Sequence, residues 1–304
     1  MTPYDGSVDV DEQVNPRDVR RVGVVGCGIM GSGIAEVAAR AGLDVIVVEA
    51  DELLASTGRE RIERSLARAH KGGKLSEADL EESLSRLRVV DDLEALADRE
   101  LVVEAVVESE AAKLDVFDRL DRIVSDDEAI LASNTSSIPI MKLAMATERP
   151  ESVIGIHFFN PVPVLKLVEL VVSLLASRST IDRANYFAES QLGKRVIRSQ
   201  DRAGFVVNAL LIPYILSAVR MYESGFATAE DIDAGMVEGC RHPMGPLALA
   251  DLIGLDTTMA VAESLYEEFK EPLYAAPPML SRMCEAGLLG RKSGRGFYRY
   301  DERR

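Results

Sequence analysis

The residue types that are rare in this chain narrow the chemistry it can perform. Its 304 residues include no tryptophan, three cysteines and three histidines. Cys27, Cys240 and Cys284 lie far apart in the sequence, with neither the close spacing of metal ligands nor the even pattern of a disulfide framework. We therefore predict no metal site, and buried thiols in a reducing compartment.

The sequence also lacks the features of a membrane or secreted protein. No apolar run approaches the about 20 residues of a membrane-spanning helix. The acidic N-terminus has no hydrophobic signal segment, and residues 1–19 have the composition of a flexible tail. These absences predict a cytoplasmic protein without a membrane partner.

Positive charge is scarce as well, because 35 Lys and Arg residues against 50 Asp and Glu residues give a net charge of −15. Nucleic acids and anionic membranes are bound by cationic surfaces, which displace counterions or meet lipid headgroups. The overall charge therefore argues against both as partners. An anionic small ligand would need a local reversal of this charge.

Eight short apolar segments have the pattern of buried strands, and helical or loop segments separate most of them. They span residues 20–25, 44–49, 88–90, 101–107, 129–132, 153–157, 166–170 and 195–197. This alternation predicts an α/β fold with a doubly wound, mostly parallel sheet. Residues 52–87 interrupt it with two helical segments that meet at residues 70–74, and we expect this helical-hairpin insert to stand off the sheet.

The pattern changes after residue 203. The run FVVNALLIPYILSAVRMYESG is apolar on nearly every face, and a helix of that kind is buried on all sides. The rest of the chain has helical patterns broken by Gly and Pro, without a strand pattern. We therefore predict an α/β domain over residues 20–203 and an all-helical domain over residues 204–304.

A glycine-rich turn, GCGIMG, joins the first predicted strand to the first helix. Gly26 would allow the tight turn, Gly28 the approach of a pyrophosphate to the backbone, and Gly31 the packing of helix on strand. The helix N-terminus would face the phosphates. Glu49, at the end of the next strand, would hydrogen-bond the ribose hydroxyls and repel a 2′-phosphate, which favours NAD over NADP. A glycine turn in a fold without a nucleotide is the alternative.

The helical segment over residues 56–71 has a cationic face. Its basic side chains recur at steps of three, four and three residues, which align them on one side of a helix. They are Arg61, Arg64, Arg68 and Lys71, with Ser65 on the same face. Such a stripe could hold phosphates, because the guanidinium group matches phosphate oxygens. A solvated helix with Glu60 and Glu63 as charge partners fits the sequence equally well.

His157 stands in the run GIHFFNPVP at the end of an apolar strand, and Glu169 follows twelve residues later. Pro161 and Pro163 bias the residues before them to extended geometry, so LKLVEL can return beside the strand. Glu169 would then approach His157, where a carboxylate can orient the imidazole and stabilise its charged form. The pair predicts a group that takes and returns a proton. A histidine satisfied within the core is the alternative.

Other polar side chains have two interpretations each. The segment SNTSS, residues 133–137, would supply hydroxyls at the carboxyl edge of the sheet, where open α/β sheets bind ligands, or would form an ordinary turn or helix cap. The side-chain amide of Asn208 either hydrogen-bonds the backbone within the core or faces the cleft between the domains. The charges at the end of the strand predicted over residues 101–107 and in the helix after it also have two interpretations. They either belong to a binding site or increase solubility; the residues are Glu104, Glu108 and Lys113.

Taken together, seven motifs resemble the 3-hydroxyacyl-CoA dehydrogenase family, specifically its short, stand-alone 3-hydroxybutyryl-CoA dehydrogenases. They occur in order over about residues 20–300: GCGIMGSGIA, VVEAVVE, SNTSSIPI, GIHFFNPVPVLKLVEL, GFVVNALLIPYILSA, HPMGPLALADLIGLD and GRKSGRGFYRY. The resemblance implies a Rossmann-type NAD domain with a helical insert, followed by an all-helical C-terminal domain that forms a homodimer.

The resemblance also assigns site residues. It implies that His157 is catalytic, that Glu169 is its paired glutamate, and that Ser136 and Asn208 bind the substrate. The residues implied to contact NAD are Gly26, Gly28, Ile29, Met30, Gly31, Glu49, Glu108, Lys113, Asn160 and Lys292. Relatives contact CoA through a serine and a lysine of the insert. Ser65 matches the serine, whereas Gly72 takes the lysine's position and Lys71 beside it is a substitute by proximity.

These expectations describe the reversible, NAD-dependent oxidation of an L-3-hydroxyacyl-CoA, with 3-hydroxybutyryl-CoA as the expected short-chain substrate. His157 would take the hydroxyl proton as the hydride leaves C3. One alternative is a related substrate, either 3-hydroxyadipyl-CoA or a free hydroxy or sugar acid. Another is a non-catalytic NAD-binding redox sensor or structural relative, which the intact proton-transfer pair disfavours.

Overall fold

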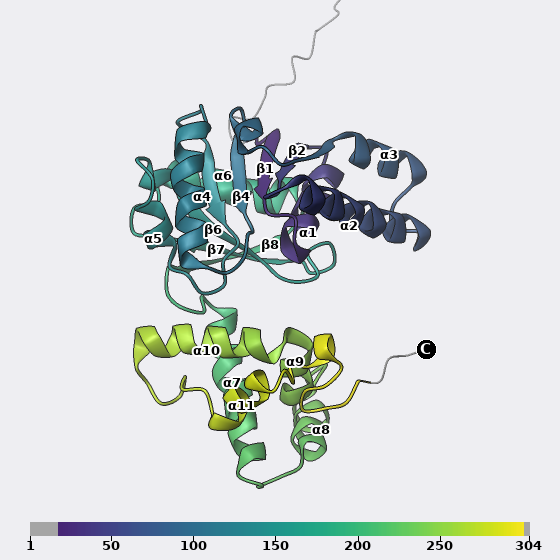
Figure 1. Ribbon diagram of the computed structural model, residues 1–304, viewed down its shortest axis with the longest axis vertical. Coiled ribbons are helices and arrows are strands. Elements are labelled where there is room, and N and C mark those ends of the chain that lie inside the picture. Colours follow the sequence, from purple (N-terminus) through teal and green to yellow (C-terminus); the bar gives the residue numbers. More distant parts are fainter. Residues whose placement is uncertain (1–17, 301–304) are drawn as a thin grey trace, which may run out of the picture.

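The apolar segments predicted as strands form one eight-stranded sheet in the computed structural model, which describes residues 18–300. A purely helical unit follows this α/β unit in the chain (Figure 1). Apart from residues 18 and 19, the predicted tail lies outside the described residues, as do residues 301–304. None of the helices among residues 18–300 combines the length and apolarity needed to cross a bilayer.

The sheet has the strand order β3-β2-β1-β4-β5-β6-β7-β8. The strands are β1 (Arg21–Val25), β2 (Asp44–Val48), β3 (Leu87–Val90), β4 (Leu101–Glu104), β5 (Ile130–Ser133), β6 (Val153–Phe158), β7 (Leu167–Val172) and β8 (Arg195–Gln200). Neighbours run parallel except for β6 and β7. The predicted mostly parallel sheet is confirmed. The strand expected over residues 101–107 ends earlier, at Glu104, where the Val106 N–H turns back to the Glu104 carboxylate.

Helices cover both faces of the sheet because its strands are apolar on both sides. They are α1 (Ile29–Arg40), α2 (Glu52–Lys71), α3 (Glu77–Ser85), α4 (Glu110–Ile123), α5 (Ile140–Ala144) and α6 (Arg178–Tyr186), with short helical turns η1 (Leu93–Leu96), η2 (Pro150–Ser152) and η3 (Phe187–Gln191). One apolar cluster joins α1, α2 and α6 to the sheet, and a second joins α4 and α5 to its other face.

The insert is the predicted helical hairpin of α2 and α3, which extends from the sheet beside α1 (Figure 1). It does not stand free along its whole length. Gly58 of α2 lies so close to the glycine turn that a Cβ atom there would be 2.6 Å from the Cys27 sulfur. The first half of α2 therefore supports the turn from outside.

The helical unit contains α7 (Val207–Glu223), α8 (Ala229–Cys240), α9 (Pro246–Ile253), α10 (Leu255–Phe269), α11 (Pro278–Glu285) and the turn η4 (Arg291–Ser293). Its core forms around α7, whose Ile215 and Leu216 pack with Leu247 and Leu265. Contrary to the prediction from the sequence, the single chain does not bury this helix on all sides. Leu210 is 73% exposed and Met221 is 41% exposed. Composition alone does not reveal how many neighbours surround a helix.

The α7 stripe is the exposed side of this helix, formed by Val206, Leu210, Ser217 and Met221. Steps of four, seven and four residues keep these side chains on one face. The stripe is apolar except for Ser217. The described residues of this chain therefore leave a line of apolar surface uncovered along α7.

The prediction that all three cysteines are buried is also wrong. The three thiols are free, but only Cys27 is buried, whereas Cys240 is exposed and Cys284 is partly exposed. Burial, together with the Glu49 carboxylate, raises the pKa of Cys27 to about 12, so this thiol is held in its unreactive form.

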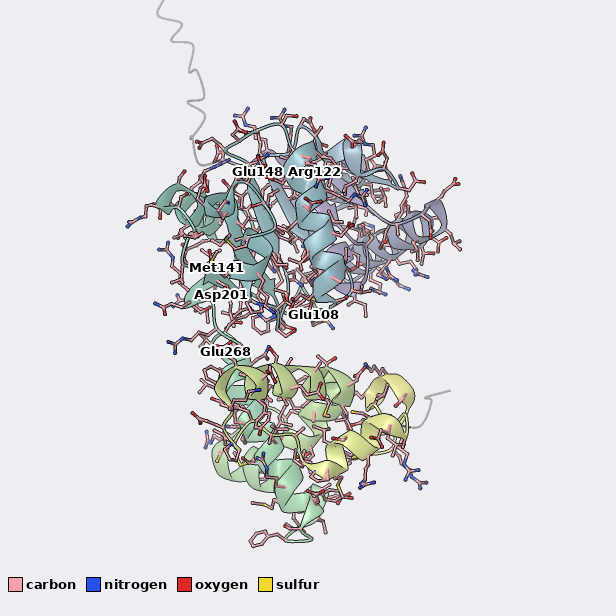
Figure 2. The ribbon with its side chains drawn as sticks, turned by 60° about the vertical axis from the view of Figure 1, so that its left-hand side comes forward. Glu108, Arg122, Met141, Glu148, Asp201 and Glu268 are labelled. Carbon is pink, nitrogen blue, oxygen red and sulfur yellow. The ribbon has the colours of Figure 1, made fainter. Side chains whose placement is uncertain are left out.

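Carboxylates fix the connection between the two units. The Asp201 carboxylate accepts the main-chain N–H groups of Ile140 and Met141 at 2.8 and 2.6 Å, and Glu268 of α10 accepts that of Ala203 at 2.9 Å. Figure 2 shows Asp201 beside Met141, and Glu268 on the side of the helical unit that faces them. Burial raises the pKa of Asp201, and the nearby Glu268 adds to this shift.

Candidate active site

His157 and Glu169 form a hydrogen-bonded pair between two antiparallel strands. They are direct register partners on β6 and β7, and His157 Nδ1 lies 2.8 Å from Glu169 Oε2. Both side chains are buried, and the rings of Phe159 and Phe205 have centroids 4.6 and 5.5 Å from the imidazole. Because the carboxylate occupies Nδ1, Nε2 is the nitrogen left to exchange a proton with a reacting group.

The second oxygen of Glu169 reaches the helical unit. Glu169 Oε1 accepts the main-chain N–H groups of Val206 and Val207 at 3.0 and 2.9 Å, where α7 begins. Free N–H groups at a helix N-terminus favour a negative charge. Asn208, which is partly exposed, is the next residue of α7. The carboxylate that orients His157 therefore also fixes the helix that carries Asn208.

A buried ionic network lies at the carboxyl end of β4. Glu104 is fully buried and Lys113 is 1% exposed, and Lys113 Nζ lies 2.6 Å from Glu104 Oε1. Ser133 Oγ donates to the other Glu104 oxygen at 2.6 Å. A role for these two charges in solubility is thereby excluded. Sequence reasoning left Glu104 undecided, although a carboxylate ending an otherwise apolar strand was the available signal.

Glu108 organises the serine-rich loop. Its Oε1 accepts the Thr135 hydroxyl at 2.6 Å, the Ser136 N–H at 3.0 Å and the Ser137 hydroxyl at 2.8 Å, and its Oε2 lies 3.2 Å from Lys113 Nζ. Burial raises the pKa of Glu108, but the Lys113 ammonium and the hydroxyl donors outweigh it, so the pKa lies below its ordinary value. Figure 2 shows Glu108 at the edge of the α/β unit that faces the helical unit.

The same loop is tied to the strand of His157 and to the helical unit. Asn134 Oδ1 accepts the main-chain N–H of Phe158 at 2.9 Å. Ser264 of α10 donates to the Ser137 carbonyl at 2.9 Å. Ser136 lies between these two anchors and is partly exposed. The loop therefore lies beside the His157 strand, at the boundary between the units.

The glycine turn has the geometry of a phosphate cradle. Gly26 has φ +92°, and a Cβ on Gly31 would lie 1.8 Å from the Gly26 carbonyl oxygen, so neither position accepts a side chain. At Gly28, by contrast, nothing lies within 4 Å of a Cβ. Helix α1 begins at Ile29 with no side-chain cap and no acidic residue in its first turn. Open space in front of uncapped N–H groups, including those of Ile29 and Met30, fits the pyrophosphate of NAD.

Glu49 lies against this turn, because its Oε1 accepts the Cys27 N–H. The carboxylate therefore stands at the end of β2, where an adenosine ribose is expected. On the other side, the Arg61 guanidinium donates to the Cys27 carbonyl. This contact corrects the predicted cationic stripe, because Arg61 serves the glycine turn and not the free face of α2.

The remaining basic residues of α2 are exposed. None of the ion pairs between residues 18 and 300 includes Arg64, Arg68 or Lys71, whereas Glu63 pairs with Arg59 at 2.8 Å. The alternative in which neighbouring glutamates neutralise the stripe therefore does not hold for these three side chains. Ser65 is partly buried on the same helix. The insert offers uncompensated positive charge on an otherwise acidic molecule.

Asn160 and Lys292, which are both expected to contact the cofactor, have different surroundings. Asn160 is exposed in the connection between β6 and β7, three residues after His157. Lys292 Nζ lies 2.5 Å from both carboxylate oxygens of Asp256, so its contact is within the helical unit. Asn160 is thus exposed shortly after the strand that carries His157, and Lys292 has a local partner.

Comparison with known proteins matches both units to one family. Residues 21–202 match the NAD binding domain of 3-hydroxyacyl-CoA dehydrogenase, and residues 204–300 match its C-terminal domain. A Mycobacterium tuberculosis protein named 3-hydroxybutyryl-CoA dehydrogenase is 59% identical over 282 residues, covering 93% of this chain and 99% of that protein.

Solved structures agree with this match. The crystal structure of M. tuberculosis FadB2 is similar with a TM-score of 0.92 at 59% identity, covering 93% of this chain and 99% of that chain. The crystal structure of (S)-3-hydroxybutyryl-CoA dehydrogenase PaaH1 from Ralstonia eutropha has a TM-score of 0.89 at 44% identity, covering 94% of this chain and 100% of that chain. The similarity therefore extends through both units.

Proposed function

Because the chain belongs to the 3-hydroxyacyl-CoA dehydrogenase family, we propose that it interconverts L-3-hydroxybutyryl-CoA and acetoacetyl-CoA at the boundary between its two units. The observation that carries this proposal is the buried His157–Glu169 pair, with Nδ1 engaged at 2.8 Å and Nε2 left for the substrate. A protein that only bound NAD would not need this pair.

NAD, when bound, accepts the hydride that leaves C3 of the hydroxyacyl group. His157 Nε2 takes the proton of the C3 hydroxyl in the oxidation and returns it in the reduction. Glu169 keeps the proton on Nδ1 of the neutral ring and stabilises the imidazolium that forms. The main-chain N–H groups of Val206 and Val207 hold the Glu169 carboxylate in place for this task.

Ser136 and Asn208 would hold the reacting end of the substrate. We assign their side chains to hydrogen bonds with the C3 oxygen or the thioester carbonyl, which fixes C3 for hydride transfer. Ser136 lies on a loop that Glu108 anchors, and Asn208 lies on the helix that Glu169 anchors. Each polar contact with the substrate therefore rests on a carboxylate that accepts main-chain N–H groups.

NAD is held by the α/β unit in this proposal, which we assign to residues 20–203. The turn from Gly26 to Gly31 receives the pyrophosphate, and Glu49 receives the ribose hydroxyls and repels a 2′-phosphate. Glu108, Lys113 and Asn160 support the nicotinamide half, and Lys292 contributes only if it leaves Asp256. We assign the binding of the CoA phosphates to Ser65 and to the unpaired cations Arg64, Arg68 and Lys71.

We assign residues 204–304 to substrate contacts and to the interface of a homodimer. The α7 stripe supports the dimer, because an apolar line on a helix is stabilised when a second surface covers it. A cytoplasmic location stays a prediction from the composition.

A substrate panel with NADH and NADPH, followed at 340 nm, tests the function. We expect turnover of acetoacetyl-CoA with NADH, slower turnover of longer 3-ketoacyl-CoAs, and little turnover of free acetoacetate. The variant His157→Gln should lose about 10²–10⁴-fold in kcat, which is the usual contribution of a positioned proton-transfer group. Its affinity for NADH should change little.

The exposed histidine variant His70→Gln is the matched control, since this ring hydrogen-bonds the Leu75 carbonyl within the insert. Near-normal turnover by His157→Gln would overturn the role of His157. A preference for NADPH would contradict the role of Glu49, and turnover of free acetoacetate alone would replace the CoA substrate.

A further inference from the structure

A buried lysine outside the site described above holds the segment that follows His157. Lys194, which is 8% exposed, lies just before β8. Its ammonium donates to the main-chain carbonyls of Val162 and Leu165 at 2.5 and 2.8 Å. Both carbonyls belong to the connection between β6 and β7, over residues 159–166. One side chain thus holds this connection at two points.

The surroundings of Lys194 disfavour its charged form. Burial lowers the pKa of Lys194, the neighbouring Arg40 lowers it further, and Glu36 opposes both effects. Glu36 is itself buried on α1, where one oxygen lies 3.3 Å from Arg40 and the other has no hydrogen-bond partner. An apolar side chain would avoid these desolvation costs. A buried ammonium at this position is therefore useful chiefly for the two carbonyls that it binds.

The connection is also packed directly on the cofactor helix. Val162 is buried, and a Cβ at Gly33 of α1 would lie 2.9 Å from its Cβ. The N–H groups of Val164 and Leu165 both donate to the Pro161 carbonyl at 2.9 Å. Lys194 and α1 thus hold the connection from two sides. Its first part, with Asn160, is left exposed at the edge of the sheet where β6 ends.

We propose that Lys194 is a positioning residue for the dehydrogenase: by fixing the carbonyls of Val162 and Leu165, it sets the placement of Asn160 relative to His157 and the N-terminus of α1. This inference rests on the proposed function, in which Asn160 supports the cofactor. Lys194 touches neither the cofactor nor the substrate and acts through the main chain of the connection.

The variant Lys194→Met tests the proposal, because it keeps the length of the side chain and removes its donors. We expect the dissociation constant for NADH, measured by fluorescence titration, to rise about tenfold, since small displacements of binding groups have effects of this order or larger. Lys194→Arg, which can also donate to two carbonyls, should recover much of the affinity. Lys166→Met, at an exposed lysine of the same connection, should behave as the wild type.

A double-mutant cycle separates positioning from general stability. If Lys194 acts through Asn160, the double variant Lys194→Met, Asn160→Ala should bind NADH no more weakly than Asn160→Ala alone. Additive losses would overturn the proposal, and so would a lowered melting temperature with wild-type affinity for NADH below the transition. If Lys194→Met does not fold, the cycle is run with Lys194→Gln, whose shorter side chain cannot reach both carbonyls, and is judged by the same criterion.

The NADH titration needs no turnover, so it remains informative if acetoacetyl-CoA proves not to be a substrate. Failure of the substrate panel with an intact Lys194–Asn160 coupling would reject the proposed substrate alone. A wild-type affinity in Lys194→Met with normal turnover of acetoacetyl-CoA would reject the role of Lys194 alone.

Discussion

Glu169 has one carboxylate oxygen engaged by each unit of the molecule. Oε2 faces His157, and Oε1 faces the first N–H groups of α7. A charged acceptor suits both, because each hydrogen bond to an ionised group contributes about 1.5–3 kcal/mol when buried. The side chain is therefore needed both for the tautomer of the imidazole and for the seating of the helix.

The variant Glu169→Gln should separate these two roles. Its amide oxygen can accept from Val206 and Val207, which leaves the amide NH₂ facing His157 Nδ1 and favours the wrong tautomer. We expect kcat to fall about 10²–10⁴-fold, as when the partner of a catalytic histidine is lost. Affinity for NADH should stay near that of the wild type.

Glu151→Gln, at an exposed glutamate, is the control for this measurement. A kcat within twofold of the wild type in Glu169→Gln would show that the ring is oriented without the charge. A loss of NADH affinity equal to the loss of kcat would instead point to a collapse of the site.

Single residues also show where sequence reasoning stops. The pairing of His157 with Glu169 could be anticipated, because the hairpin that brings them together is local in sequence. The partners of Glu104 could not, since Lys113 and Ser133 approach it from a separate helix and strand. Lys194 carries no sequence signal, because a lysine before a strand is normally solvated.

Among the elements, α2 has two sides with different tasks. Its inner side supports the glycine turn through Gly58 and Arg61, and its outer side presents unpaired cations. The spacing of the basic residues predicted one continuous stripe. Spacing could not reveal that Arg61 turns inward, because the acceptor of its hydrogen bond is a main-chain carbonyl 34 residues earlier.

Reversing the charge of the outer side tests its assignment to CoA. The triple variant Arg64→Glu, Arg68→Glu, Lys71→Glu should raise KM for acetoacetyl-CoA about tenfold or more, because charge-assisted bonds to phosphate are lost and repulsion is added. KM for NADH should stay constant, since Arg61 still holds the turn. Steady-state kinetics at low and moderate salt measure both constants.

The control is the swap Arg59→Glu, Glu63→Arg, which leaves the charge of α2 unchanged and preserves an existing ion pair. An unchanged KM for acetoacetyl-CoA in the triple variant would favour a small free acid as the substrate. A parallel rise in KM for NADH would mean that the helix had shifted as a whole.

At the scale of the whole molecule, the mostly parallel sheet and the change to a helical unit could both be predicted, since each depends on apolar periodicity. The exposed apolar surface of the helical unit could not be predicted. Its first helix is apolar on nearly every face, yet Leu210 and Met221 remain exposed in the single chain. An apolar surface looks the same in sequence whether the chain itself or a second copy covers it.

The double variant Leu210→Glu, Met221→Glu tests whether a second copy covers the α7 stripe. Two buried carboxylates without partners would oppose association, so we expect a homodimer in the wild type and a monomer in the variant. Light scattering after size-exclusion chromatography gives the masses. Phe226→Glu, at an exposed apolar residue in the loop after α7, is the control off the stripe. A monomeric wild type, or a variant that remains dimeric, would contradict the assignment.

The single antiparallel pair in the sheet has a consequence for how the protein assembles. All other neighbouring strands are separated in the sequence by helical segments or by further strands. In contrast, β6 and β7 are joined by one short connection. Closing a short loop costs little chain entropy, and local contacts form early. His157 and Glu169 can therefore meet before the distant strands have joined the sheet, so their pairing depends on one of the least demanding folding events in the chain.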